Sequence, residues 1–347
     1  MNQSTGRREF LKYAAAVTVG TGLLTTAGGA QEQGQKQKGN RKKQKRGAEA
    51  QVLGQGQGAR LLKACQYNML PKDLKDAEKF ALAKKCGFEG IELNRPLADL
   101  DAAKEMGALA KKCGFEGIEL NGPIADLAAA KELGEQARQA GVPIHSIVNG
   151  GWDAPLSDPK PETIEKGIAG METSLRCAKA VGANAVLLVP AVVNEEVGYG
   201  EAWERSQKNV RKLLPLAKEL QVIIAVENVW NKFLLSPLEF AKYVDEFDDV
   251  WLKAYIDVGN MILFGYAQDW LRTVGKRIVR IHLKDFKRKG YQWTNLLDGD
   301  VNWPQVRKAL EEIGYQGYLT PELSRGDEAY LTDLVQRIDK IIAMKTA

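Results

Sequence analysis

The chain has 347 residues, of which 44% are hydrophobic and 27% are charged, a composition typical of a globular protein and unlike that of a disordered or collagen-like chain. The formal net charge of +5 comes from the amino end, because residues 1–60 carry 11 basic and 3 acidic side chains while the remaining 287 residues carry 38 and 41. The remaining 287 residues thus carry no excess of basic side chains, which argues against a nucleic-acid partner. With only two histidines, a site built from several imidazoles is excluded.

Residues 1–30 contain the three parts of an export signal in the expected order. Arg7 and Arg8 are followed by the weakly apolar residues 13–27 and then by the small residues 28–30. A charged start, a short apolar stretch and a small-residue end indicate a signal that is removed rather than a membrane anchor. The paired arginines resemble a twin-arginine signal. This predicts the twin-arginine export machinery as a partner, a periplasmic location and no integral membrane segment in the mature chain.

Residues 31–60 are rich in Gln, Gly, Lys and Arg, and such a stretch buries too little apolar surface to fold. We expect a disordered basic linker here. A polybasic run can also contact an anionic surface, but a solvated spacer is the favoured interpretation. The four cysteines of the chain show no metal-binding spacing. Because they fall in predicted strands and helices, we expect free thiols and no disulfide framework.

Residues 61–347 alternate short β-branched runs with longer helical patterns, which predicts βα units. Helices are expected over residues 161–181, 202–220, 237–247 and 303–313. So many units in 287 residues favour an α/β fold of the TIM (β/α)₈ barrel type over an open sheet. The predicted strands cover residues 62–68, 88–93, 115–120, 144–148, 185–189, 222–227, 252–257, 278–283 and 318–323.

This count is nine rather than eight because one unit occurs twice. Residues 82–106 and 109–133 agree at 21 of 25 positions, so a single βα unit is tandemly duplicated. Adding a ninth strand changes the strand number and shear that close a barrel. We therefore expect one copy to form an excursion from an eight-stranded barrel, with a nine-stranded barrel as the less favoured alternative.

Four polar residues stand at the carboxyl ends of successive predicted strands, namely Glu227, Asp257, His282 and Glu322. In a barrel of parallel strands these ends form the catalytic face. A charged side chain that ends an apolar strand is costly unless it is paired or bound to a metal. Three carboxylates and one imidazole form an oxygen-rich ligand set, which suits Mn²⁺, Mg²⁺ or a similar divalent ion.

With these motifs in place, residues 61–347 resemble the xylose isomerase-like TIM-barrel family of sugar (phosphate) isomerases and epimerases, a family that includes D-tagatose 3-epimerase and L-ribulose-5-phosphate 3-epimerase. The most specific stretches are residues 227–237, 257–260 and 282–285. The resemblance places the family's metal ligands on Glu227, Asp257, His282 and Glu322 and its substrate-binding arginine on Arg288. The resemblance implies one divalent metal ion, with Mn²⁺ as the first choice and Mg²⁺, Co²⁺ and Zn²⁺ as alternatives.

Further residues are candidate sugar contacts. The epimerase branch of this family has a histidine where this chain has Asn260, whose amide still offers hydrogen bonds to a hydroxyl group. Trp230 and Asn231 are candidates for the lining of the sugar pocket, with packing under the loop as the equally weighted alternative. His145 is predicted to end its strand. Its two alternative roles are contact with a sugar hydroxyl group and a hydrogen bond to the backbone in the core.

The leading hypothesis is a metal-dependent isomerase or epimerase that acts on a ketose through a cis-enediolate, with Glu227 and Glu322 as the acid and base. A lyase or dehydratase acting on a keto-sugar or inosose uses the same metal and base. A periplasmic sugar-binding protein is the alternative of another class, although binding alone needs no pair of bases. Export favours a free sugar over a phosphorylated one. A homodimer and a tetramer both remain open.

Overall fold

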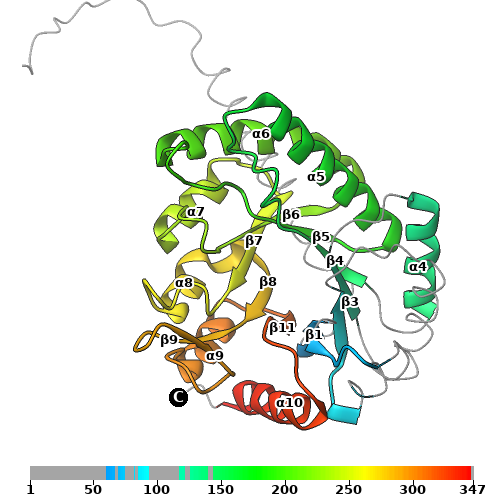
Figure 1. Cartoon of the computed structure of the whole chain (residues 1–347), viewed down its shortest axis with the longest axis vertical. Coiled ribbons are helices and arrows are strands. Elements are labelled where there is room, and N and C mark those ends of the chain that lie inside the picture. Colours follow the sequence, from blue (N-terminus) through cyan, green and yellow to red (C-terminus); the bar gives the residue numbers. More distant parts are fainter. Residues whose placement is uncertain are drawn as a thin grey trace, which may run out of the picture. The chain divides into compact units, whose positions relative to one another are not determined.

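The computed structural model describes residues 60–66, 69–74, 82, 85–93, 117–121, 126–139 and 144–344 (Figure 1). The predicted signal peptide, the linker up to residue 59 and Cys113 lie outside the described residues. The other three cysteines, Cys65, Cys86 and Cys177, are buried. Within the described part of the chain, no helix combines the length and the apolar character that a membrane span requires.

Nine of the described strands form a closed parallel barrel, with helices on its outside (Figure 1). Each of these strands pairs with the next barrel strand along the chain, and the barrel closes where the last strand pairs with the first through Leu61 and Gly317. The predicted α/β TIM-barrel fold is therefore confirmed. Its strands are β1 (Leu61–Gln66), β2 (Gly90–Leu93), β3 (Gly117–Asn121), β4 (Ile144–Asn149), β5 (Ala185–Leu188), β6 (Ile223–Glu227), β7 (Leu252–Asp257), β8 (Ile278–Leu283) and β11 (Gly317–Pro321).

The barrel contains nine strands within the described residues, because each copy of the repeated sequence supplies one strand. The expectation of eight strands with one copy as an excursion is wrong. β2 and β3 pair so that equivalent residues of the two copies face each other, Gly90 beside Gly117 and Leu93 beside Leu120. With both copies in the barrel, the ladder of backbone hydrogen bonds runs without a break from β1 to β4. A copy outside the barrel would instead need other hydrogen-bond partners for its backbone N–H and C=O groups.

The helices begin and end at residues that favour those positions. α7 starts after Ser236, whose hydroxyl oxygen accepts a hydrogen bond from the Glu239 amide at 3.2 Å, and α5 ends before Gly182, which has a φ of 86°. The described helices are α4 (Leu127–Gln139), α5 (Pro161–Val181), α6 (Tyr199–Leu220), α7 (Pro237–Asp245), α8 (Ala267–Val274), the 3₁₀ turn Gly275–Arg277, α9 (Trp303–Glu312) and α10 (Glu328–Ala343).

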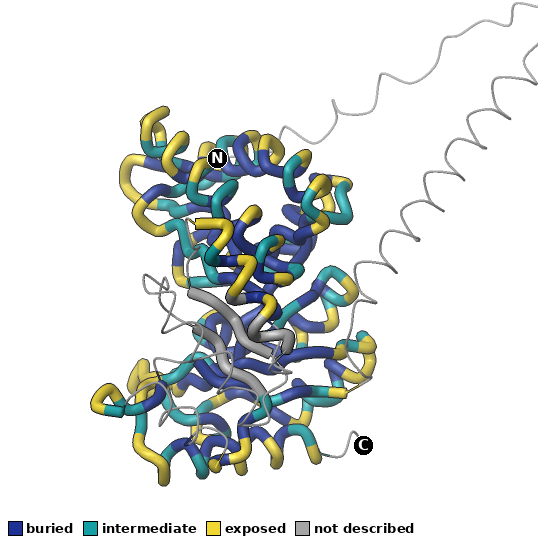
Figure 2. Tube along the Cα trace, turned by 90° about the vertical axis from the view of Figure 1, so that its right-hand side faces the viewer, coloured by how far each residue is buried: buried dark blue, intermediate teal, exposed yellow. Residues whose placement is uncertain are grey.

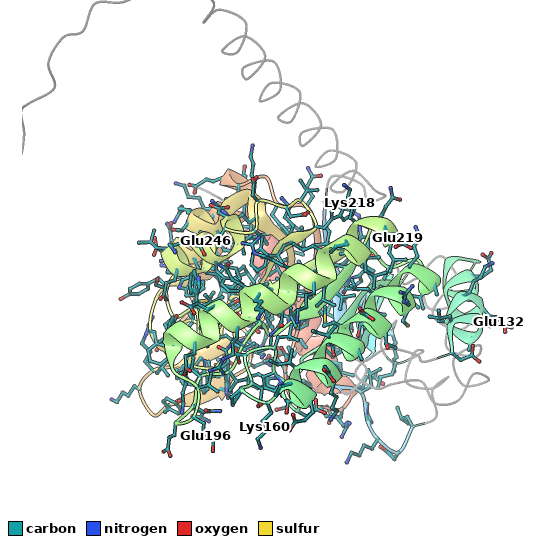
Figure 3. The ribbon with its side chains drawn as sticks, turned by 90° about the horizontal axis from the view of Figure 1, so that it is seen from above. Glu132, Lys160, Glu196, Lys218, Glu219 and Glu246 are labelled. Carbon is teal, nitrogen blue, oxygen red and sulfur yellow. The ribbon has the colours of Figure 1, made fainter. Side chains whose placement is uncertain are left out.

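Buried residues lie along the barrel strands and on parts of the helices, whereas exposed residues lie mainly on the outer helix turns and loops (Figure 2). Alternation along the strands divides the core into two layers. On β6, Ile224 and Val226 belong to the large cluster that also includes helix residues, whereas Ile223 and Ala225 belong to a separate, smaller cluster. We assign the smaller cluster to the barrel interior. Glu227 continues the interior series at the end of the same strand. Charged residues of the helices and loops instead point outward, as Figure 3 shows for Glu132, Lys160, Glu196, Lys218 and Glu219.

A short hairpin of β9 (Asp285–Lys287) and β10 (Gln292–Thr294) follows β8 and was not predicted. Its first residue, Asp285, is fully buried, and its carboxylate accepts four hydrogen bonds. The donors are the amides of Phe286 at 2.9 Å, Leu297 at 3.0 Å and Val301 at 3.1 Å, and the indole of Trp303 at 2.8 Å. Asp285 therefore anchors the loop that connects the hairpin to α9.

We expect Asp285→Ala to destabilise the fold more than it changes the chemistry of the site. The substitution leaves buried donors without an acceptor, and each such group costs about 1–3 kcal/mol. The free energy of unfolding measured in urea should fall by about 3 kcal/mol or more. Glu219→Gln, on the exposed face of α6, is the control and should leave this free energy unchanged. An equal stability of the two variants contradicts the anchoring role.

Candidate metal centre

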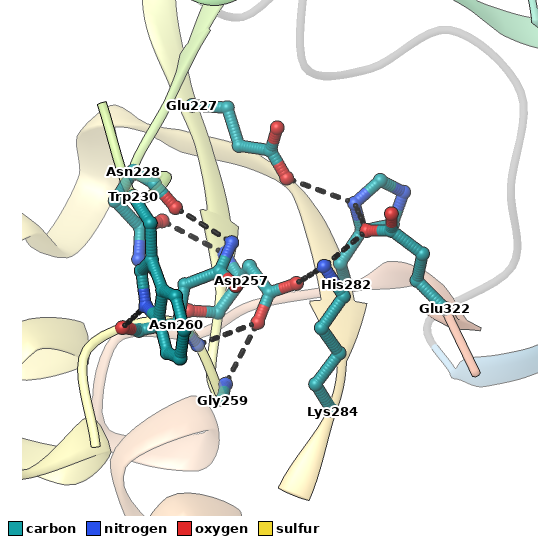
Figure 4. Close-up of polar contacts among 9 residues, drawn as sticks. All are labelled: Glu227, Asn228, Trp230, Asp257, Gly259, Asn260, His282, Lys284 and Glu322. Atoms are coloured by element: carbon teal, nitrogen blue, oxygen red, sulfur yellow. Dashed lines mark hydrogen bonds and ion pairs between the residues drawn. The ribbon is translucent and has the colours of Figure 1, made fainter. Parts of the chain in front are cut away.

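The structure brings together the four strand-end residues that were predicted as metal ligands (Figure 4). Glu227, Asp257 and His282 end or nearly end β6, β7 and β8, and Glu322 follows β11. One potential ligand atom from each side chain lies within 4.8 Å of the others. These four strands are consecutive neighbours in the barrel, so their carboxyl ends converge at one part of its mouth.

The imidazole of His282 lies between the two glutamates. Its Nδ1 atom is 3.1 Å from Glu227 Oε1 and 3.4 Å from Glu322 Oε2. The Glu227 carboxyl is buried, whereas the Glu322 side chain is 36% exposed. Burial raises the pKa of Glu227 to about 7, against the opposing effect of the hydrogen bond from His282. Burial thus makes the charged form of the Glu227 carboxyl costly, and a cation bound beside it would offset that cost.

Asp257 is held rigidly by the turn that follows β7. Its Oδ1 accepts hydrogen bonds from the amides of Gly259 at 2.7 Å and Asn260 at 3.0 Å. The Asn228 side chain links the ends of β6 and β7, because it accepts from the Asp257 amide and donates to the Asp257 carbonyl, both at 2.9 Å. The turn also approaches β8 closely, since a Cβ on Gly259 would lie 2.4 Å from Lys284 Cβ.

Lys284 places an ammonium group against the same carboxylates. Its Nζ is 2.8 Å from Glu322 Oε2 and 3.3 Å from Asp257 Oδ2, and its side chain is only 16% exposed. Burial alone would lower the pKa of Lys284, but the surrounding carboxylates, that of Asp257 first, raise it well above its usual range. Lys284 therefore stays charged and offsets part of the negative charge of this cluster.

The donor set fits a divalent metal ion. Three carboxylates carry three negative charges, and a divalent cation together with Lys284 balances them. Asp257 uses Oδ1 for the turn and directs Oδ2 toward the other ligands and Lys284, where it accepts no hydrogen bond from the described residues. An oxygen-rich set with a single imidazole is one that Mn²⁺, Mg²⁺ and Zn²⁺ accept. The residues that could hold the ion are thus Glu227, Asp257, His282 and Glu322.

A cavity of about 640 Å³ lies at this group of residues. Polar and aromatic side chains share its wall, which suits a ligand with both hydroxyl groups and an apolar face. Three of the predicted ligands contribute to it, and Asp257 lies behind them. The lining residues are Gln66, Val148, Asn149, Gly150, Gly151, Trp152, Asp153, Leu187, Val189, Glu227, Val229, Trp230, Asn260, His282, Lys284, Trp293 and Glu322.

Two of the predicted sugar contacts line this cavity. Trp230 donates from its indole nitrogen to the Asn260 carbonyl at 2.7 Å, and the Asn260 amide group donates to the Asn228 carbonyl at 2.9 Å. These bonds fix both side chains beside the predicted metal ligands. Asn231 is instead buried under the loop, where it donates to the Ala191 carbonyl at 2.7 Å, and it is not among the residues that line the cavity.

His145 is not at the carboxyl end of its strand, as was expected, because β4 begins at Ile144. Its ring stacks on Tyr318 at a centroid distance of 4.0 Å, and its Nδ1 is 2.8 Å from Ser146 Oγ. The Arg280 guanidinium donates to the His145 carbonyl at 2.9 Å. These contacts correspond to the core alternative, and His145 does not line the cavity.

Arg288 also lies apart from the described cavity wall. Its guanidinium donates to the Gly265 carbonyl at 2.8 Å and lies over the Tyr266 ring at 4.9 Å, and its backbone amide donates to Asp300 at 2.8 Å. These contacts hold Arg288 against the loop between β7 and α8. Its placement here gives no support to the substrate contact implied by the family resemblance.

Lys284, Trp152 and Trp293 are among the cavity residues that were not predicted as site residues. The signal for Lys284 was its position two residues after His282, because alternate residues of a strand point to the same side. The hairpin that carries Trp293 and the turn that carries Trp152 have no comparable periodicity.

Comparisons with known proteins agree with this architecture. The family model described as "Xylose isomerase-like TIM barrel" matches residues 107–341. An L-ribulose-5-phosphate 3-epimerase of Escherichia coli is 23% identical over 47% of this chain, and this chain spans 58% of that relative's length. The 3-keto-D-glucoside 4-epimerase from E. coli superposes with a TM-score of 0.60 at 16% identity, covering 81% of this chain and 98% of that one. The IOLI protein with a bound zinc atom superposes with a TM-score of 0.61 at 16% identity, and the match covers 82% of this chain and 100% of that one. Because the family model matches well over half of its residues, the chain belongs to the xylose isomerase-like TIM barrel family.

Proposed function

We propose that this protein is a metal-dependent isomerase or epimerase that acts on a ketose or keto-sugar. One observation carries the proposal: two glutamates from different strands face the same imidazole at the mouth of the cavity, with distances of 3.1 Å and 3.4 Å. A site that only binds a metal does not need two glutamates that differ in their exposure to solvent. One of these glutamates is buried and the other is 36% exposed.

The reaction we infer moves a proton at a carbon next to a carbonyl group. Glu227 and Glu322 would hold the ion together with Asp257 and His282, and the bound ion would supply polarisation of the substrate carbonyl. One glutamate would take the proton from carbon, and the other would return it to the other face or to the neighbouring carbon. Lys284, which lies between Asp257 and Glu322, would face the negative charge that develops on the enediolate oxygens.

Known proteins of similar sequence or fold support this reaction class. The E. coli relative is named as a 3-epimerase of a sugar phosphate, and one structural neighbour is named as an epimerase of a 3-keto-glucoside. Another neighbour holds zinc, which supports a divalent ion here. We propose Mn²⁺ as that ion, because three of the four ligands are carboxylates. We further propose export to the periplasm through the twin-arginine signal, which favours an unphosphorylated sugar.

The test is solvent-deuterium incorporation into a panel of ketoses and keto-sugars, followed by NMR. The protein is measured with Mn²⁺ and again after chelation. We expect deuterium at a carbon beside the carbonyl, with at least about 100-fold loss on chelation and recovery when Mn²⁺ returns. The products separate an epimerase from an isomerase and from a lyase, which would release a β-substituent. Metal-loaded protein that labels none of the sugars contradicts the proposal and favours a binding protein.

We expect Lys284→Met to slow deuterium exchange by about 100-fold, the usual cost of removing one group that stabilises a developing oxyanion. Metal content should stay at one ion per chain, because Lys284 is a cation rather than a ligand. Lys284→Arg keeps the charge and should recover part of the rate. A Met variant with the full exchange rate shows that the ammonium group only balances charge in the absence of substrate.

A further inference from the structure

We propose that the cavity contains a second sugar subsite, lined by Trp152, Trp230 and Trp293, and that the substrate is a keto-sugar joined to a second ring. This inference rests on the proposed function, because it concerns the substrate of the same site. The keto ring would lie at the four predicted metal ligands, and the attached ring would lie against the indoles. The chemical class is therefore a keto-glycoside of disaccharide size rather than a free monosaccharide.

The size of the cavity is the first argument. It measures about 640 Å³, and because a water molecule takes about 30 Å³ in the liquid, this is room for roughly 20 waters. A ketohexose has about 12 non-hydrogen atoms and a disaccharide about 23, and ligand pockets of 300–1,000 Å³ ordinarily hold drug-sized molecules. A free ketohexose would leave much of this space to water, whereas a disaccharide matches it.

The second argument is a preformed aromatic platform beside the predicted metal ligands. Trp230 and Trp293 stack with their ring centroids 4.9 Å apart and an interplanar angle of 30°. Phe286 is fully buried and supports both indoles, with edge contacts at 5.5 Å and 5.0 Å. Trp230 and Trp293 nevertheless remain 36% and 41% exposed. Indole surface that is held in place but left accessible suits the C–H face of a sugar ring.

Lys284 joins this platform to the predicted metal ligands. Its Nζ lies 5.5 Å from the centroid of the Trp293 ring and 2.8 Å from Glu322 Oε2. Trp293 and Glu322 thus lie near the same ammonium group, so a ring against Trp293 and a keto ring at Glu322 would be neighbours in the cavity.

Trp152 forms another part of the wall, on the loop after β4. Gly151 has a φ of 64°, which favours glycine, and a Cβ on Gly150 would lie 2.8 Å from the Trp152 ring. Two successive glycines thus allow the indole to fold back over the backbone, where it stays 53% exposed. Asn149, the last residue of β4, and Asp153 on the same loop also line the cavity, so polar groups that can bind hydroxyl groups flank the apolar ring.

The decisive experiment compares matched probes that differ only by the second ring. The pairs are 3-ketoglucose with 3-ketocellobiose, and D-fructose with lactulose, which is a ketose that carries a galactosyl group. Binding is measured by calorimetry on the metal-loaded Glu322→Gln variant, and exchange is measured on the wild type. We expect the two-ring member of at least one pair to bind at least 10-fold more tightly and to exchange with a correspondingly higher kcat/KM.

Substitution at the platform should affect only the two-ring probes. In the Glu322→Gln protein, adding Trp293→Ala or Trp152→Ala should weaken binding of the two-ring probe by about 10-fold, in line with a stacking contact of about 1.4 kcal/mol. Binding of the one-ring probe should change less than 2-fold. Trp293→Phe should recover part of the loss. Phe264→Ala is the matched control, because Phe264 is 70% exposed and does not line this cavity.

The possible outcomes separate the two proposals. If wild-type protein exchanges one-ring and two-ring probes equally, the second subsite is wrong and the proposed function stands. If two-ring probes bind tightly and depend on Trp293 but no sugar exchanges deuterium, the subsite stands and the proposed function is wrong. Failure of all four probes to bind the metal-loaded protein overturns the subsite.

Discussion

Glu322→Gln is expected to slow deuterium exchange by about 1,000-fold, within the range that a positioned acid or base contributes. The Glu322 carboxylate contacts His282 at 3.4 Å and Lys284 at 2.8 Å and is the more exposed of the two glutamates. Glutamine preserves the shape of the side chain and one oxygen for the metal but cannot take up a proton. The rate is measured by NMR in deuterium oxide with saturating Mn²⁺.

The controls distinguish lost chemistry from lost structure. Glu219→Gln makes the same chemical change on the outer face of α6 (Figure 3) and should keep the full rate. Glu227→Gln should lose conversion of the sugar to product to a similar extent, because the proposed reaction needs both glutamates. If one of the two Gln variants still converts the sugar while the other does not, a single base carries the proton and the two-base form of the proposal is wrong.

Asp257→Asn is expected to weaken metal binding by at least about 100-fold, more than the usual effect of losing a partner outside the ligand set. The change is nearly isosteric, and asparagine can still accept the hydrogen bonds from the Gly259 and Asn260 amides. It removes one negative charge from a fully buried position, where charge acts most strongly on a cation. Titration with Mn²⁺, followed by electron paramagnetic resonance, gives the affinity.

Exchange activity should follow metal occupancy in this variant, so excess Mn²⁺ should restore part of the rate. Thermal unfolding gives the necessary check that the barrel remains folded. Asp257→Glu is an informative second change, because it keeps the charge but adds a methylene at a fully buried position. An Asn variant that binds Mn²⁺ with wild-type affinity shows that Asp257 is not a ligand.

Much of the barrel could be read from local sequence pattern. Each of the nine predicted strand segments overlaps an observed strand, and the predicted helix over residues 161–181 has those bounds in the structure. Apolar runs and helix-ending glycines act over a few residues, so they are visible without the fold. The number of strands in the closed barrel could not be predicted from local pattern, because closure depends on pairing between β1 and β11, which are far apart in the chain.

The four predicted metal ligands were visible for a related reason. Parallel strands of a closed barrel end on the same face, so polar residues that follow apolar strands converge there whatever the loops do. Glu227 shares its strand face with the interior residues Ile223 and Ala225, and alternation along a strand is a local property. The sequence by itself therefore determined the fold class and the identity of the candidate ligands.

Only the tertiary structure decided what surrounds them. Lys284 lies between two carboxylates, Trp293 stacks on Trp230 from a separate hairpin, and Arg288 is held against the loop after β7. His145 proved to be a core residue, because its neighbours Arg280 and Tyr318 come from other strands. These contacts join segments that are distant in sequence, through side-chain packing that has no period along the chain. Local pattern thus specifies the strands and their ends, whereas packing of the loops determines the wall of the site and the size of its cavity.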